Sequence, residues 1–372
     1  MMKGFVVTPW EVKGKIDYQK LVKNFGVELL DEKILAQIKQ HTHELHYFLE
    51  RKIFFAHKYF DLILKEYEKG NKFYLYTGRA PSGPVHLGHL IPWIFAKWLQ
   101  DKFDATLIFQ IPDEEKFFFK DNLTLEETKK WAYDNILDII AIGFDPKKTK
   151  IFLDTEYAGH LYKYACLVAK KVTFSTVKAL FGFKESNNLG EIFYTCMQSV
   201  PAFLPTIWEN KPTPCLIPCA VDQDVHFRLT RDIAPKLGFP KPSTILCKFL
   251  PSLTEGGKMS TSVENTAIFT TDTPEKVRTK IIKYAFSGGR ATVEEHRKKG
   301  GIPEIDVSYQ YLTFYLEDSK RLKQIYEDYK SGKMLTGELK EITIEVINKF
   351  LKEHQKRREE AKDKIEEFML RD

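Results

Sequence analysis

The stretch FYLYTGRAPSGPVHLGHLIPW, at residues 73–93, decides the fold. It begins with a short run of β-forming residues and ends in a segment whose apolar spacing predicts a helix over about 87–103. The loop between them, GRAPSGPVHLGH, holds three glycines, two prolines and two histidines, although a turn needs only one glycine or proline. A strand that passes through a glycine-rich loop into a helix is typical of open α/β sheets, which bind ligands beside such loops.

Strand-like and helix-like segments alternate after this stretch. We expect strands at 73–77, 106–111, 150–154, 215–222 and 243–249, and helices at about 87–103, 124–142, 156–171 and 225–236. This alternation predicts a parallel sheet with helices on both faces. The predicted fold class is therefore α/β, with a doubly wound, Rossmann-type sheet.

The flanking regions have helical patterns. Residues 16–69 place apolar residues at three- and four-residue spacing, and no strand pattern follows about residue 272. We expect an N-terminal extension over 1–70, a nucleotide-binding domain over 71–272 and an all-helical domain over 273–372. An insertion over about 156–212 is rich in aromatic residues, which suit either a core or a subunit interface.

The composition is that of an ordinary soluble protein. The chain has 372 residues, of which 43% are hydrophobic and 29% charged. No run is long enough to span a membrane, and the N-terminal residues become polar too early for a signal peptide. The five cysteines show no pair of metal-binding spacings, so reduced thiols are the simplest interpretation. We expect a cytoplasmic protein with no membrane association and no metal held by the chain.

The net charge of +6 is compatible with an RNA partner without establishing one. Acidic residues largely offset the short basic clusters, so a solvated surface explains each cluster taken alone.

Two histidines end the glycine-rich loop. His86 and His89 lie three residues apart, so a helical turn places both on one side. Glycine lets the backbone approach a phosphate closely, and the helix N-terminus offers free N–H groups there. Imidazoles in this position can donate hydrogen bonds to charge that develops on a triphosphate. A plain turn with two packed histidines is the alternative, and this short motif alone leaves both open.

A second stretch, GGKMSTS at 256–262, joins glycines to a lysine and three hydroxyls. Lys258 can pair with phosphate oxygens, while Ser260 and Ser262 can donate hydrogen bonds to them. Alone, such a stretch is more often a surface loop. Together with HxGH far upstream, it resembles the two signature sequences of class I aminoacyl-tRNA synthetases.

Longer stretches resemble one branch of that class, the tryptophanyl-tRNA synthetases of the eukaryotic and archaeal type. The resemblance extends nearly from end to end. The stretches that carry it are PWEV (9–12), FYLYTGRAPSGPVHLGHLIPW (73–93), FQIPDEEKF (109–117), VTFSTVKALFGF (172–183), CLIPCAVDQDVHFRLTRD (215–232), KMSTS (258–262), AFSGGR (285–290) and YLTFYLEDSKRL (311–322).

The resemblance implies a two-step reaction used in protein synthesis. The carboxylate of L-tryptophan attacks the α-phosphate of ATP, pyrophosphate leaves together with Mg²⁺, and the tryptophanyl group passes to the 3′ end of tRNA(Trp). It also implies a homodimer, whose interface we expect within 156–210, and an anticodon-binding role for the helical domain. PWEV folds against the active site in this family, so Trp10 is a further candidate.

The family motifs also imply roles for single residues, with His86, His89 and Lys258 as the catalytic ones. The residues expected to contact ATP are Gly78, Arg79, His86, Gly88, His89, Lys116, Asp222, Lys258, Met259, Ser260 and Ser262. The residues expected to contact tryptophan are Tyr76 and Gln110 at the indole N–H, and Glu115, Gln198 and Gln223 around the ammonium and carboxylate. The indole N–H is a donor, so acceptors suit it, and a pocket that binds through it rejects phenylalanine.

One position departs from the class pattern. Thr261 stands where many class I enzymes carry a second lysine. The missing charge must come from elsewhere, and Arg79 and Lys116 are our candidates.

Three other interpretations stay open at this point. A tyrosyl-tRNA synthetase is the nearest, but a phenol pocket is expected to offer an aspartate where this chain has Gln110 and the DEEK stretch. Nucleotidylyltransferases also place HxGH after a first strand, but they are usually much shorter and lack a helical C-terminal third. An inactive paralogue is disfavoured by the intact His86, His89 and Lys258.

Overall fold

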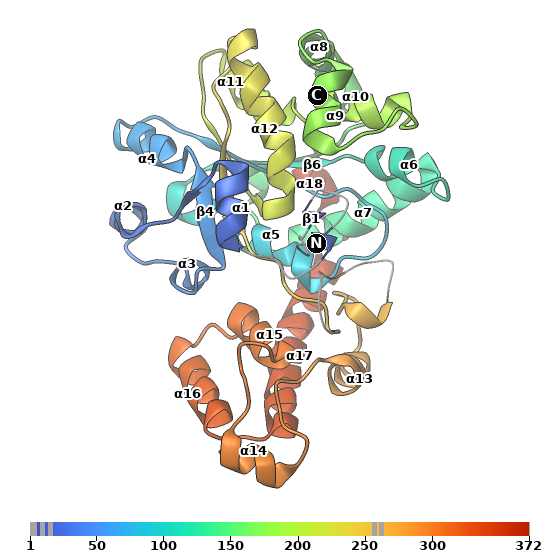
Figure 1. Cartoon of the computed structure of the whole chain (residues 1–372). Helices are drawn as coiled ribbons and strands as arrows, with labels where there is room; N and C mark the ends of the chain where they lie inside the picture. Colours follow the sequence, from blue (N-terminus) through green and yellow to red (C-terminus); the bar gives the residue numbers. More distant parts are fainter. Residues whose placement is uncertain (1–5, 8–11, 14–17, 255–258, 260–263, 372) are drawn as a thin grey trace.

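The computed structural model describes residues 6–7, 12–13, 18–254, 259 and 264–371. Within these residues, a seven-stranded mixed sheet forms the centre of the molecule (Figure 1). In spatial order its strands are β3 (Glu28–Leu29), β4 (Phe54–Lys58), β9 (Ser243–Cys247), β8 (Cys215–Ala220), β5 (Tyr74–Gly78), β6 (Thr106–Ile111) and β7 (Thr149–Leu153). A separate small antiparallel pair joins β1 (Val6–Val7) and β2 (Val12–Lys13).

The five strands from β9 to β7 are parallel and doubly wound. The chain starts at β5, moves outward through β6 to β7, and then returns to β8 on the other side of β5 and on to β9. The strand order therefore reverses between β5 and β8, and open α/β sheets bind ligands at this switch point, beyond the carboxyl ends of the strands. The predicted α/β class and the parallel arrangement of these five strands are confirmed.

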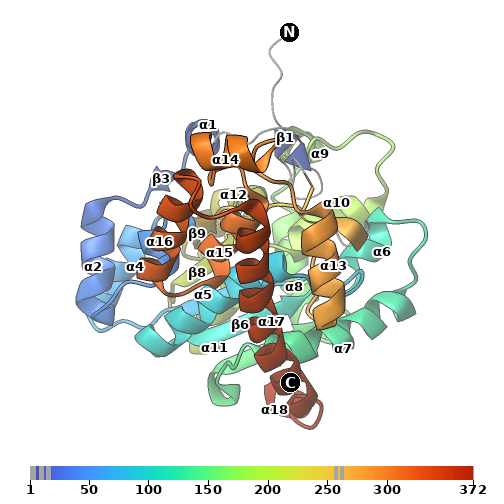
Figure 2. The same cartoon turned by 90° about the horizontal axis from the view of Figure 1, so that it is seen from below.

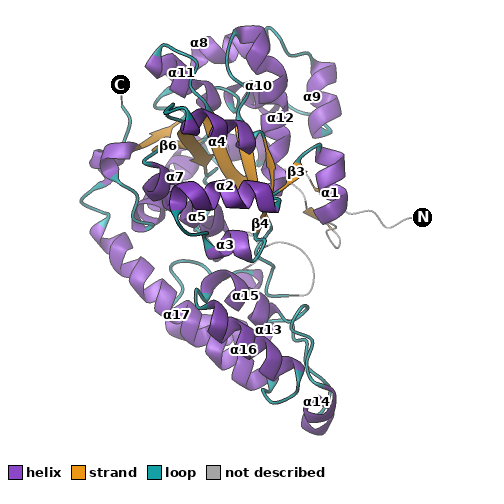
Figure 3. Ribbon diagram, turned by 90° about the vertical axis from the view of Figure 1, so that its left-hand side faces the viewer, coloured by secondary structure: helices purple, strands orange, loops and turns teal. Residues whose placement is uncertain are grey.

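Helices cover both faces of the sheet, as Figure 3 shows. Side chains alternate between two cores along each strand, so Leu75 packs with the first face while Tyr76 packs with the second. The helices of the first face are α2 (Glu32–Thr42), α3 (Tyr47–Glu50), α4 (Phe60–Glu68), α5 (Leu87–Phe103) and α7 (Leu125–Ala141). The second face and its periphery carry α1 (Tyr18–Phe25), α6 (Glu115–Phe119), α8 (Ala158–Ala169), α9 (Phe174–Phe181), α10 (Leu189–Met197), α11 (Leu204–Glu209) and α12 (Asp224–Ile233).

The expectation of helix throughout residues 16–69 is wrong at two places. β4 lies inside this region and pairs antiparallel with β9, and β3 extends the sheet beyond β4. The run IFFAHK is apolar on both sides because it lies between two layers of the core, and such a short run has no periodicity that separates a strand from a buried helix.

The C-terminal part is helical, as predicted. It comprises α13 (Pro274–Tyr284), α14 (Val293–Lys299), α15 (Val307–Tyr315), α16 (Ser319–Lys330), α17 (Thr336–Glu360) and α18 (Ile365–Phe368). Side chains of α13, α15 and α17 join the core of the first sheet face, and α15, α16 and α17 also share a second apolar cluster. In Figure 2, α17 crosses from this helical part toward α7 and ends near α18.

The end of the chain returns to the sheet. Leu370 donates its backbone N–H to the carbonyl of Ile151 at 2.7 Å, beside the edge strand β7. An exposed strand edge invites pairing with other chains, and this segment covers part of it. None of the described helices is both long and apolar enough to span a membrane.

Candidate active site

A cavity of about 500 Å³ opens beyond the carboxyl ends of β5 and β8, at the switch point of the sheet. This size suits a small-molecule site. Its wall contains every predicted site residue that the structure describes: Tyr76, Gly78, Arg79, His86, Gly88, His89, Gln110, Glu115, Lys116, Gln198, Asp222, Gln223 and Met259. The predicted Trp10, Lys258, Ser260 and Ser262 lie outside the described residues.

The two histidines form a stacked pair at the start of α5. His86 is the N-cap residue, and its backbone N–H donates to Nδ1 of His89 at 3.1 Å. The two rings lie 3.4 Å apart between centroids, at an angle of 17°. Because Nδ1 of His89 accepts this hydrogen bond, the proton of its neutral ring resides on Nε2. A Cβ on Gly88 would lie only 3.2 Å from the His86 ring, so a side chain at this position would force the ring to shift by a few tenths of an ångström.

The two signature regions are joined by backbone hydrogen bonds. Leu87 donates its N–H to the carbonyl of Ile268, and Thr270 donates its N–H to the carbonyl of Val85. The segment that follows KMSTS is therefore paired with the first signature, although about 180 residues separate them in the chain. Met259 also lies near Gly88, since its Sδ would be 3.6 Å from a Cβ at that position. This pairing gives a physical reason why the two motifs occur together.

Arg79 adds a cation to the cavity wall that the histidine pair also lines. Its Nη1 donates to the carbonyl of Ala80 at 2.6 Å, whereas Nε and Nη2 are buried and have no hydrogen-bond partner among the described residues. Burial lowers the pKa of Arg79 to about 10, partly offset by the charges of Glu115 and Asp138, so the side chain stays charged at neutral pH. Two buried N–H groups without a partner fit an anionic ligand such as a phosphate.

A further set of polar side chains on the cavity wall forms a continuous hydrogen-bonded chain. Tyr76 donates to Oε1 of Gln110 at 2.5 Å and accepts from Nε2 of Gln198 at 3.1 Å. Tyr76 and Gln110 come from neighbouring strands, and Gln198 follows α10 directly. All three side chains are buried and line the cavity.

Tyr194 extends this chain to a buried carboxylate. Its hydroxyl lies 2.7 Å from Oε1 of Gln198 and 3.0 Å from Oε2 of Glu115, and Oε1 of Glu115 accepts from Lys116 at 2.7 Å. Burial raises the pKa of Glu115, but the Lys116 ammonium and further partners outweigh it, and the net pKa lies below its ordinary value. Glu115 is therefore negatively charged at neutral pH and suits an ammonium ligand.

Asp222 and Gln223 lie in the turn between β8 and α12. A buried ion pair fixes the start of this helix, with both oxygens of Asp224 accepting from Nη2 of Arg231 at 2.9 and 3.0 Å. Thr244 on the neighbouring strand donates to the same carboxylate at 3.1 Å. This turn is thereby held over the cavity, with the Asp222 side chain buried.

The sequence reasoning missed Tyr194 and Asp154. Tyr194 lies in the aromatic-rich insertion, and Gln198 follows it by one helical turn. Asp154 was counted as the last strand residue, although it follows β7 at the carboxyl edge of the sheet and accepts from Nε2 of Gln110 at 2.7 Å. Its position next to Gln110 on the neighbouring strand was the available signal.

Comparisons with known proteins agree with this geometry. The family model described as "tRNA synthetases class I (W and Y)" matches residues 68–352. The tryptophan–tRNA ligase of Saccharolobus solfataricus is 54% identical over 370 residues, which cover 99% of this chain and 96% of the relative. That of Pyrococcus horikoshii is 50% identical over 371 residues, covering 99% and 94%.

The chain belongs to the tryptophanyl-tRNA synthetases. Solved structures of this family have the same fold. The tryptophanyl-tRNA synthetase of Giardia lamblia matches with a TM-score of 0.90 at 39% identity, covering 95% of this chain and 96% of that one. That of Plasmodium falciparum matches with a TM-score of 0.89 at 43% identity, covering 95% and 97%. The family resemblance predicted from the motifs, and the class I assignment, are confirmed.

Proposed function

We propose that the cavity at the switch point is where this tryptophanyl-tRNA synthetase joins tryptophan to ATP. The enzyme is a tryptophan–tRNA ligase, as its family membership shows. The observation that carries the proposed site is that two kinds of group line one cavity. We call the oxygen acceptors of Tyr76 and Gln110 its acceptor end, and the unused N–H groups of Arg79 together with the histidine pair its cationic end.

Tryptophan occupies the acceptor end in this proposal. Its indole N–H donates to the oxygens of Tyr76 and Gln110, while Glu115 receives the ammonium group. Gln198 and Gln223 contact the ammonium and carboxylate. Phenylalanine has no N–H for the two buried oxygens and is rejected for that reason.

ATP occupies the cationic end. A carboxylate oxygen of tryptophan attacks the α-phosphorus, the bond to the bridging oxygen breaks, and pyrophosphate leaves. The stacked imidazoles of His86 and His89 and the Arg79 guanidinium stabilise the charge that moves onto the phosphate oxygens. Gly78 and Gly88 let the phosphates approach the backbone, and Asp222 contacts the ribose. No side chain acts as a nucleophile, so the chain works by positioning and electrostatics.

Arg79 and Lys116 are the two candidates for the positive charge that a second lysine provides in many class I enzymes. Their surroundings differ. Lys116 is already paired with Glu115, whereas Arg79 has two nitrogens available. We therefore assign the larger share of the missing charge to Arg79. Lys258, Met259, Ser260 and Ser262 belong to the same ATP site in this proposal.

Mg²⁺ is implied by the family's use of ATP. The described residues contain no group of three or more His, Cys, Asp or Glu side chains that could hold a metal ion. Triphosphate oxygens and water are the usual magnesium ligands in such sites, so the ion enters with ATP.

The interface of a homodimer is proposed on α8, α9 and α10, which lie side by side in Figure 1. Large apolar side chains are exposed there, including Leu189 at 83% and Tyr162 at 59%. A hollow of about 310 Å³ beside them is lined mainly by apolar side chains. Exposed apolar patches of this kind mark interaction sites.

Light scattering after gel filtration tests this interface. Leu189→Asp should convert a dimer to a monomer, and Leu29→Asp is the matched control because Leu29 is 54% exposed on the far edge strand β3. A monomeric unsubstituted chain, or a dimeric Leu189→Asp variant, would contradict it.

The helical part from α13 to α18 is our candidate for anticodon binding, and a cytoplasmic location also remains a prediction.

ATP–pyrophosphate exchange with each of the twenty amino acids tests the proposed site. We expect exchange with tryptophan, and at least a 100-fold loss in His86→Ala or Arg79→Met, in the range of lost transition-state donors. Exchange that needs no amino acid would point to a nucleotidylyltransferase, and full activity in both variants would show that the chemistry takes place elsewhere.

A further inference from the structure

Asp154 lies directly behind the tryptophan end of the cavity. It follows β7, next to the strand that carries Gln110, and only 1% of its surface is exposed. Its Oδ2 accepts from Nε2 of Gln110 at 2.7 Å. A carboxamide has an acceptor end and a donor end, so an acceptor at this position holds the NH₂ group of Gln110 away from the cavity.

The direction of this hydrogen bond determines those that follow. With its NH₂ group on Asp154, Gln110 presents Oε1 to Tyr76, whose single hydroxyl proton is donated to it. The Tyr76 oxygen then acts only as an acceptor toward the rest of the cavity, and it already receives one bond from Gln198. If the Gln110 amide turned over, its NH₂ group would face the indole N–H, and two donors would oppose each other.

We infer that Asp154 is a positioning residue that sets the direction of the hydrogen bonds around the indole, so that Tyr76 and Gln110 both act as acceptors. This inference rests on the proposed function, because it takes tryptophan to bind at the Tyr76–Gln110 end. It makes Asp154 a determinant of substrate specificity that does not contact the substrate.

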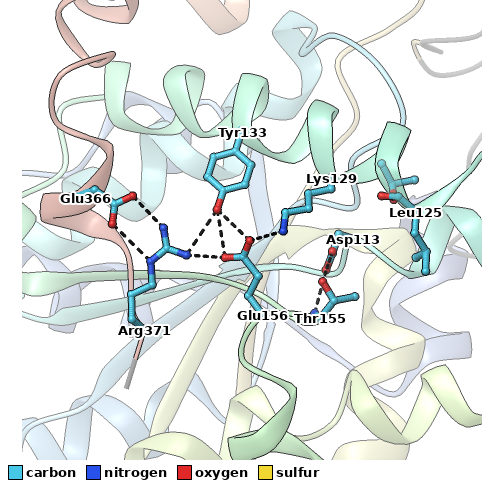
Figure 4. A network of polar contacts seen from close by, with 9 residues as sticks. Asp113, Leu125, Lys129, Tyr133, Thr155, Glu156, Glu366 and Arg371 are labelled. Atoms are coloured by element: carbon cyan, nitrogen blue, oxygen red, sulfur yellow. Dashed lines mark hydrogen bonds and ion pairs between the residues drawn. The ribbon is translucent and has the colours of Figure 1, made fainter.

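The backbone that carries Asp154 is held firmly by the next two residues (Figure 4). Thr155 donates both its backbone N–H, at 3.0 Å, and its hydroxyl, at 2.5 Å, to the carboxylate of Asp113. Glu156 accepts from Tyr133 at 2.9 Å and pairs with Lys129 at 2.8 Å and Arg371 at 2.6 Å. Figure 4 shows this cluster joining α7 to the end of the chain. A support fixed in this way can hold Gln110 in one orientation.

The protonation of Asp154 is compatible with this role. Burial raises the pKa of Asp154 to about 8. Burial and the charge of Asp154 raise the pKa of Glu114 well above its ordinary value. The two carboxyls therefore hold at least one proton between them at neutral pH. A hydrogen bond between the Asp154 and Glu114 side chains can carry this proton, which leaves Oδ2 of Asp154 as an acceptor for Gln110.

The test compares tryptophan with β-(3-benzothienyl)alanine, which has the same shape but a sulfur atom in place of the indole N–H. The measured quantity is the ratio of kcat/KM for the two substrates in ATP–pyrophosphate exchange. In Asp154→Asn, whose amide can present either end to Gln110, we expect this ratio to fall about tenfold or more. Asp306→Asn is the matched control, a buried carboxyl of the helical part that accepts from Gly288 and Tyr329 instead of Gln110, and should keep the ratio of the unsubstituted enzyme.

An exchanged pair makes the test independent of the stability of the single variant. In Asp154→Asn combined with Gln110→Glu, the amide and the acid trade places, so residue 110 again offers only acceptors to Tyr76 and the indole. This double variant should recover the preference for tryptophan. A single variant that loses activity equally on both substrates, or a folded double variant that still fails to discriminate, overturns the inference. If the unsubstituted enzyme itself shows no preference for tryptophan, the proposed function fails instead.

Discussion

Lys280 offers a sharp test of how the ATP site is held in place. It lies on α13 with only 5% of its surface exposed, beneath the segment that follows the second signature. Its Nζ donates to Oδ2 of Asp272 at 2.7 Å and to the carbonyl of Ala267 at 3.0 Å, and it lies 4.6 Å from the centre of the Phe269 ring. This segment pairs with the first signature, so Lys280 supports both motifs.

Lys280→Met keeps the length of the side chain and removes its charge. It leaves the buried carboxylate of Asp272 without a cation, a change that typically costs about 3–5 kcal/mol. Asp272 still accepts from the backbone N–H of Phe269 at 2.9 Å, so we expect the lower end, about 3 kcal/mol of unfolding free energy. Lys276→Met, on the exposed side of the same helix, is the matched control and should change stability by no more than about 0.5 kcal/mol.

Urea unfolding followed by tryptophan fluorescence measures these differences at one fixed protein concentration. The double variant Lys280→Met with Asp272→Asn should be more stable than Lys280→Met alone, because it also removes the unpaired charge. The KM for ATP should rise in Lys280→Met while the KM for tryptophan stays constant. Equal stability of the Lys280 and Lys276 variants, or single effects that simply add in the double variant, would refute the reasoning.

Three further predictions concern the cavity wall and Asp154 behind it. Gly78→Ala should lower stability by about 1–3 kcal/mol, because its Cβ would lie 2.9 Å from the Gln110 carbonyl oxygen. Gly337→Ala is the control and should not lower stability, because open space surrounds that position; thermal unfolding compares the two variants. Arg79→Met should lower kcat/KM for ATP about 10²–10³-fold, while fluorescence titration should show unchanged affinity for tryptophan. If Arg79→Ala and Lys116→Ala both retain the normal exchange rate, neither residue replaces the second lysine. Burial raises the pKa of Asp154 from 3.8 to about 8, so between these pH values the native state holds a proton that the unfolded state has lost. The contribution of Asp154 to stability therefore falls as pH rises through this window. Asp154→Asn should flatten that part of the pH–stability curve in urea melts at pH 5, 6.5 and 8, and unchanged slopes would contradict the assignment.

Much of the sheet could be predicted because its parallel strands are buried on both faces. The predicted strands at 73–77 and 106–111 agree with β5 and β6 to within one residue, since each is a compact apolar run that ends at glycine, proline or a polar residue. β4 could not be recognised in the same way. Its residues lie between helical segments, and its partner β9 is almost 190 residues away, so pairing was not visible in the local pattern.

Site residues that belong to a sequence motif could be predicted. Those that join the site only through tertiary contacts could not. His86, Gly88 and His89 form one continuous motif, and the structure brings them to the same cavity as Gln198 and Asp222. Tyr194 and Asp154 complete the polar network through side-chain contacts across the sheet and the insertion. Such contacts depend on strand order and on the position of α10, which no local pattern encodes.

The most direct test of the proposed site is a crystal structure with a stable analogue of tryptophanyl-adenylate. We predict that the indole nitrogen lies within hydrogen-bond distance, about 2.7–3.2 Å, of the Tyr76 oxygen and of Oε1 of Gln110. The phosphate mimic should lie beside Arg79 and the stacked histidines. An indole bound away from Tyr76 and Gln110, or a phosphate mimic that contacts neither Arg79 nor His86, would contradict the account.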